Sequence, residues 1–147
     1  MRALRTPQDI VNLMSLRRVI LHAFVWLCVF ALWLAATRRF HPTWTIAGSA
    51  TAILVSASAL AVYLDAFVLR PRFARRRLWP QYALTLFAAV AVLDLAAVLS
   101  IGAVYDWLWR PDPLRFGFWF NVLSDGFIIL LHLAVAAFVM RRRPTES

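Results

Sequence analysis

Residues 70–79 read Arg-Pro-Arg-Phe-Ala-Arg-Arg-Arg-Leu-Trp, and long apolar runs flank them on both sides. Five arginines cannot enter the hydrocarbon of a bilayer, so this stretch must lie outside it if its neighbours are membrane spans. Short loops rich in basic residues stay on the cytoplasmic side. The stretch therefore predicts on which side of the membrane each neighbouring segment ends.

The composition of the chain is that of a membrane protein. Of its 147 residues 63% are hydrophobic, whereas soluble domains are about 45 to 50% apolar. Several runs of about 20 apolar residues would leave little polar chain to cover a soluble core. We therefore expect an all-α integral membrane protein.

The apolar runs predict four transmembrane helices within one domain, residues 19–143. The expected spans are residues 19–37, 43–69, 78–104 and 118–140. A basic, interfacial segment (1–18) precedes the domain and a short cytoplasmic tail (144–147) follows it. Short connections make sequential helices antiparallel, so we expect an antiparallel four-helix bundle.

The basic residues are all arginine, and the formal net charge is +9. Twelve of the sixteen arginines lie in residues 1–18, in the middle loop or directly after the last span, at residues 141–143. This bias predicts that both termini are cytoplasmic, in the bacterial inner membrane. Lipid phosphates are the nearest anions, so we expect lipid rather than nucleic acid as the partner of the loop arginines Arg70, Arg72, Arg75, Arg76 and Arg77.

Aromatic residues gather where the predicted outer connections meet the spans. Such rings prefer the headgroup level of a bilayer, which predicts an aromatic belt. A docking face for a partner protein is the alternative. The residues concerned are Trp44, Trp107, Trp109, Phe116, Phe118 and Trp119.

Small residues recur at four-residue spacing in the second span. Gly48, Ala52 and Ser56 form one set, and Ala57 and Ala61 form another. Small side chains let helix backbones approach closely within a bilayer. We therefore predict that these residues form a helix–helix interface.

Two aspartates lie inside predicted spans. Asp94 is about ten residues, or ~15 Å, from the outer end of span three, and Asp125 is about seven residues, or ~10 Å, from that of span four. Asn121 and Ser124 lie beside Asp125 along the chain. Intramembrane acids often serve as proton relays, cation sites or partner contacts, so these four residues are the candidate site. The alternative is a purely structural hydrogen bond within the bundle.

Asp65 differs from these two because it lies near the cytoplasmic end of span two. It is within reach of Arg70. We predict an ion pair at the membrane interface, of the modest strength that exposed pairs have.

Two histidines lie in the inner half of the predicted bundle, His22 on span one and His132 on span four. Histidines on different helices can ligate haem, and a single one can ligate chlorophyll. Their estimated depths differ, so we expect hydrogen-bonded packing residues and no cofactor or metal, with haem or chlorophyll ligation as the alternative. The single cysteine, Cys28, allows no internal disulfide.

Catalytic templates are missing from the sequence. It has no glycine-rich phosphate loop, no Gly-x-Ser-x-Gly elbow and no His-Glu-x-x-His motif. We therefore expect a protein that is not an enzyme.

Two stretches of the sequence combine aromatic and polar residues at the ends of predicted spans. They run from His22 to Leu27, His-Ala-Phe-Val-Trp-Leu, and from Tyr63 to Phe73, Tyr-Leu-Asp-Ala-Phe-Val-Leu-Arg-Pro-Arg-Phe, the latter followed by three arginines and Tyr82. Together with the order of the four spans, they resemble the membrane domain of LytS-like sensor histidine kinases. The resemblance covers residues 19–143 and implies a sensory input domain. The kinases continue into a catalytic domain, whereas this sequence ends seven residues after Met140, so only the membrane part of that function is expected.

These observations lead to three functional hypotheses. The first is a stand-alone sensory or regulatory module that works through a partner protein. The second is a structural accessory subunit of a larger respiratory or photosynthetic membrane complex. The third is a small transporter, which is disfavoured because the spans show no broken helices and few polar residues.

Overall fold

The structure, a computed structural model, describes residues 7–74, 78–109 and 117–141. Within these residues every regular element is a helix, and four helices are long and apolar enough to cross a membrane. This confirms the predicted all-α class and the four apolar spans. The elements are α1 (Pro7–Thr37), η1 (Arg38–Phe40), α2 (Trp44–Leu64), η2 (Asp65–Leu69), α3 (Arg70–Ala74), α4 (Trp79–Leu108) and α5 (Phe118–Arg141).

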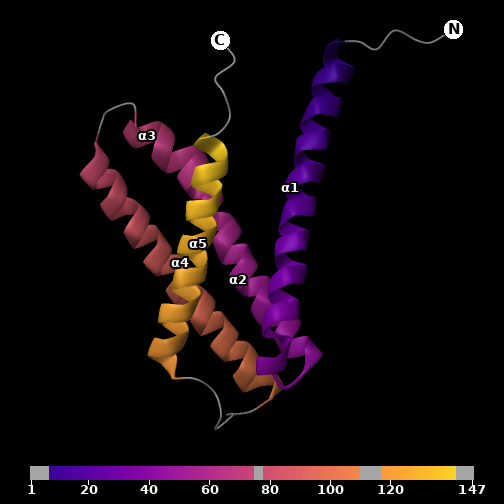
Figure 1. The fold of residues 1–147 in the computed structure, drawn as a ribbon, viewed down its shortest axis with the longest axis vertical. Coiled ribbons are helices and arrows are strands. Elements are labelled where there is room, and N and C mark those ends of the chain that lie inside the picture. Colours follow the sequence, from indigo (N-terminus) through magenta and orange to yellow (C-terminus); the bar gives the residue numbers. More distant parts are fainter. Residues whose placement is uncertain (1–6, 75–77, 110–116, 142–147) are drawn as a thin grey trace, which may run out of the picture.

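The helical bundle has two distinct ends. The beginning of α1, the end of α5 and the short helix α3 lie toward one end, which we call the α3 end (Figure 1). The 3-10 turn η1, the end of α4 and the beginning of α5 lie toward the other, the η1 end.

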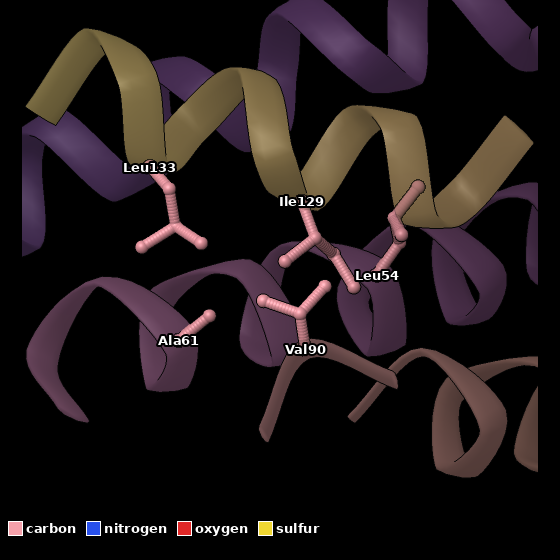
Figure 2. Close-up of a cluster of buried hydrophobic side chains, with 5 residues drawn as sticks. All are labelled: Leu54, Ala61, Val90, Ile129 and Leu133. Carbon is pink, nitrogen blue, oxygen red and sulfur yellow. The ribbon is translucent and has the colours of Figure 1, made fainter. Parts of the chain in front are cut away.

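Helix α2 is the centre of the helical bundle. It packs against α4, α5 and α1, and it is the most buried of the four long helices. Figure 2 shows the apolar core where α2, α4 and α5 meet. Its buried side chains are Leu54, Ala61, Val90, Ile129 and Leu133.

The small-residue interface on α2 is only partly where the sequence predicts it. Ala61 belongs to the core, but Ala52 and Ser56 are exposed, so the stripe that they form is not a helix contact. The buried face of α2 instead carries Ile46, Ala47, Ala50, Thr51, Leu54, Val55, Ser58 and Ala61. Small residues occur on both faces of this helix, so their spacing alone could not identify the packed one.

Helix α1 is peripheral. No residue of its apolar span is fully buried, and the helix diverges from the other three toward its beginning (Figure 1). Hydrogen bonds connect it to its neighbours: Trp26 Nε1 donates to the Tyr63 hydroxyl on α2 at 3.0 Å, and Trp33 Nε1 donates to His132 Nε2 on α5 at 3.2 Å. These polar contacts, together with a half-buried stripe that includes Trp26, Phe30 and Trp33, attach α1 to the bundle.

The second span contains a widened turn, the π-helical segment η2. The backbone N–H of Arg70 donates to the carbonyl of Asp65, five residues earlier. Proline at position 71 accounts for this widening, because it lacks an N–H and its ring would clash with the carbonyl four residues before it. The helix then continues into α3.

The end of α4 corrects one predicted boundary. The helix runs to Leu108, beyond the expected end at residue 104, and Tyr105 is buried against the bundle. The described members of the predicted aromatic belt are all exposed, as expected of rings at a bilayer surface. Phe116 lies outside the described residues.

Candidate functional site: a mainly apolar cavity and two aspartates

A cavity of about 560 Å³ lies between the four long helices at the η1 end. Its walls are mainly apolar and are supplied by α1, α2, α4 and α5, together with η1 and the turn after it. The lining residues that carry a charge or a hydrogen-bonding side chain are Trp33, Thr37, Arg39, His41, Thr51, Tyr105, Asn121, Ser124 and Asp125. Three of the four residues of the predicted site thus line one cavity.

Asp125 is the acidic residue in the cavity wall. Ser124 Oγ lies 3.1 Å from the backbone carbonyl oxygen of Asn121 and 3.4 Å from Asp125 Oδ1, so these two acceptors share its single proton. In the described part of the chain no arginine or histidine forms an ion pair with it. The charge of this carboxylate is therefore poorly compensated within the protein.

Asp94 lies beside this cavity wall but is not itself part of the lining. Its side chain is buried, with 5% exposure, and its Oδ1 atom has no hydrogen-bond partner. Gly126 on α5 makes room for it, because a Cβ atom on Gly126 would lie 3.3 Å from Asp94 Oδ2. The Asp94 carboxyl group therefore sits against the backbone next to Asp125, close enough for the two groups to interact electrostatically.

The contacts of Asp94 within this chain are internal, and its contact with a partner protein stays a prediction. The residue faces α5 inside the bundle, so an effect on another protein would have to pass through helix packing. Ser58 on α2 is a second buried group whose Oγ lacks a hydrogen-bond partner. Buried polar atoms without partners are rare in native proteins and often mark functional positions.

His41 and Tyr105 border the cavity at the η1 end. His41 Nδ1 and the Tyr105 hydroxyl are 2.5 Å apart, and a guanidinium nitrogen of Arg38 donates to the His41 carbonyl at 2.8 Å. Burial, reinforced by the positive charge of Arg38, lowers the pKa of His41 below its usual value of 6.5. The imidazole is therefore held neutral, and its bond to Tyr105 ties the turn before α2 to α4.

A separate polar cluster occupies the α3 end. Arg70 and Asp65 form an ion pair at 2.6 Å, and the Tyr82 hydroxyl donates to Asp65 Oδ1 at 2.6 Å. The pairing predicted from the sequence is confirmed, but it is not an exposed interfacial one, since the Asp65 side chain is only 2% exposed.

The π-helical turn makes this ion pair possible. In an α-helix, residues five apart point about 140° away from each other, since each residue advances about 100°. The hydrogen bond from residue 70 to residue 65 brings both side chains to one face instead. Widened turns of this kind are frequent at functional sites.

The two histidines of the predicted bundle interior are both hydrogen-bonded. His132 accepts from Trp33 and donates from Nδ1 to the carbonyl of Ile128 at 2.8 Å, so both of its ring nitrogens are engaged. His22 Nδ1 bonds to the Tyr63 hydroxyl at 2.9 Å. His132 is half-buried and held by two hydrogen bonds, whereas His22 is exposed on α1.

The remaining residues of the predicted sites are the arginines that follow Arg70. Arg72 is exposed at the α3 end, whereas Arg75, Arg76 and Arg77 lie outside the described residues. No cluster of three or more His, Cys, Asp or Glu residues that could hold a metal occurs in the described ranges.

Three residues of these sites could not be assigned from the sequence. Trp33 and Tyr105 resemble the other aromatic residues at span ends, and His41 resembles an ordinary turn residue. They line the cavity only because the fold brings their distant chain segments together.

We compared the chain with protein-family models, with curated proteins and with solved structures, and none of the three comparisons found a match. The functional assignment therefore rests on the geometry described above.

Proposed function

We propose that this protein is a non-enzymatic, multi-pass membrane protein of the bacterial inner membrane that acts as a sensory or regulatory module through a partner protein. In this proposal the bundle is antiparallel, both termini are cytoplasmic, and the η1 end faces outward. The arginine bias supports this orientation.

One observation carries the proposal: the cavity and the arginines of α3, Arg70 and Arg72, lie at opposite ends of the same helices (Figure 1). Thr51 of α2 and Tyr105 of α4 line the cavity. At the α3 end Asp65, in η2 directly after α2, pairs with Arg70 and accepts a hydrogen bond from Tyr82 of α4. Occupation of the cavity could thus alter α2 and α4 packing and reach the arginine segment through rigid helices. The resemblance to LytS-like membrane domains supports the same type of function.

A topology experiment tests the orientation. Reporters fused after Ser147 and within residues 72–77 are expected in the cytoplasm, and one within residues 110–115 outside. An outside location for the middle loop would overturn the proposed orientation.

A structural accessory subunit is the second candidate, favoured by the exposed apolar surface of α1. Recovery of the tagged protein from native membranes after mild detergent extraction distinguishes the two. Stoichiometric recovery with one large complex would establish the subunit. Substoichiometric recovery with a kinase or regulator supports the sensory module, and recovery of neither contradicts both.

A small transporter remains the third candidate. The unpartnered buried groups Asp94 and Ser58 are the observation in its favour. A proton or cation flux in liposomes that Asp94→Asn abolishes would replace the sensory proposal.

A further inference from the structure

We infer that the cavity at the η1 end binds a protonated organic amine with a compact apolar or aromatic body, and that Asp125 pairs with its ammonium group. The inference rests on the proposed function in one respect: it names the class of ligand to which the module would respond. Binding itself can be measured without any partner protein.

The size and walls of the cavity fit a small organic molecule. Its volume of about 560 Å³ lies within the range of about 300 to 1,000 Å³ that is typical of ligand pockets. The walls are mainly apolar, with the rings of Trp33 and Phe120 among them. Such walls suit an apolar body better than a hydrated inorganic ion, and aromatic faces attract cations.

The charge at Asp125 selects a cation. Its carboxylate has no ion-pair partner among the described residues, and its hydrogen bond from Ser124 is long at 3.4 Å. The carboxyl group of Asp94 lies beside it, close enough to interact with it electrostatically. An ammonium group would compensate this charge and form short, charge-assisted hydrogen bonds with the carboxylate.

The basic residue of the lining does not compete with this arrangement. The Arg39 guanidinium lies over the ring of its neighbour Phe40, 4.9 Å from the ring centroid. It comes from η1, whereas Asp125 lies more than one turn into α5. Among the described residues Arg39 forms no ion pair with Asp125, so the carboxylate is open to a ligand cation.

Equilibrium dialysis of the full-length protein in detergent tests the inference. The probes are 1-naphthylmethylamine, which is charged at pH 7, and its neutral isostere 1-naphthylmethanol, with empty micelles as the reference. We expect saturable, equimolar binding of the amine and at least tenfold weaker binding of the alcohol. Absence of saturable amine binding, or equal affinity for both probes, would overturn the inference.

Variants assign the charge recognition to Asp125. Asp125→Asn is expected to weaken amine binding at least tenfold, and Asp125→Glu, which keeps the carboxylate, to restore most of it. Asp106→Asn is the matched control, since Asp106 does not line the cavity. Thermal unfolding of each variant verifies that it is folded. An unchanged affinity in folded Asp125→Asn would contradict the assignment.

Filling the cavity tests the location separately from the charge. Ile101 lines the cavity and is partly buried, so Ile101→Trp is expected to weaken binding of both probes severalfold. Undiminished binding in this variant would place the amine elsewhere. If the amine binds as expected but no partner is recovered from membranes, the proposed sensory function fails while the binding site stands.

Discussion

Asp65 and Asp94 are both buried aspartates of the same helical bundle, yet their surroundings are opposite. Asp65 receives a guanidinium and a phenol hydroxyl at 2.6 Å each. Asp94 Oδ1 has no hydrogen-bond partner, and the carboxyl group lies against Gly126. The partners of Asp65 explain its burial by a structural role. Burial of Asp94 has no compensating contact among the described residues and costs stability, so it calls for a functional explanation.

The largest expected effect comes from breaking the paired site. Arg70→Gln would leave Asp65 as an uncompensated buried charge, which typically costs about 3 to 5 kcal/mol. Because Arg70 is about one-third exposed, we expect the lower end, about 3 kcal/mol. Denaturant or thermal unfolding in detergent measures it. Arg72→Gln, an exposed neighbour, should change stability by less than about 0.5 kcal/mol, and equal effects of the two substitutions would refute the structural role of the pair.

A second effect compares the two aspartates directly. Asp65→Asn weakens two charge-assisted contacts and is expected to cost about 1 to 3 kcal/mol. Asp94→Asn removes no hydrogen bond observed here, so it should lower the unfolding free energy less than Asp65→Asn does. If Asp94→Asn proves the more damaging of the two, Asp94 has a structural partner and the contrast between the sites is lost.

A third effect probes the space that Gly126 leaves for Asp94. Gly48→Ala meets no atom within 4 Å and should gain about 0.5 to 1 kcal/mol from helix propensity. Gly126→Ala would push against Asp94 Oδ2, so we expect it to be less stable than Gly48→Ala by about 1 kcal/mol. The same unfolding assay decides, and an equal gain in both variants would mean that Asp94 moves away without cost.

The smallest effect concerns the third polar contact, between His41 and Tyr105. Because the pKa of His41 is lowered in the folded protein, the unfolded chain binds its proton more readily. The contribution of the neutral His41 side chain to the stability of the fold is complete above pH 6.5 and decreases as the pH falls below that value. The thermal stability of His41→Gln should accordingly decline less between pH 7 and pH 5 than that of the wild type, and parallel declines would argue against this role of His41.

The sequence predicted the large elements because they follow from hydrophobicity alone. Four long apolar runs require four helices in a bilayer, and arginines mark where they end. The pairing of Asp65 with Arg70 was predictable from proximity in the chain, but its burial was not, since it depends on a widened turn before Pro71 and on Tyr82 from another helix.

The candidate site was predictable only in part. Asp94, Asn121, Ser124 and Asp125 stood out as polar residues within apolar spans. The cavity, by contrast, arises from the way α1 meets the other helices at the η1 end, and the periodicity of a nearly uniformly apolar helix does not indicate which face packs. The same ambiguity explains why Ala52 and Ser56 were assigned to the wrong face of α2.

The central claim is that Asp94, whose Oδ1 atom lacks a hydrogen-bond partner in the described part of the chain, serves a sensory module and not only the fold. Partner recovery from native membranes tests this claim most directly. Tagged wild type, Asp94→Asn, Asp94→Leu and the control Asp106→Asn would be extracted in mild detergent at equal abundance, and the co-purifying kinase or regulator quantified. We predict that Asp94→Asn and Asp106→Asn recover the partner like the wild type, whereas Asp94→Leu recovers severalfold less. Equal recovery by all four proteins would contradict the claim and leave Asp94 as a tolerated polar residue of the bundle.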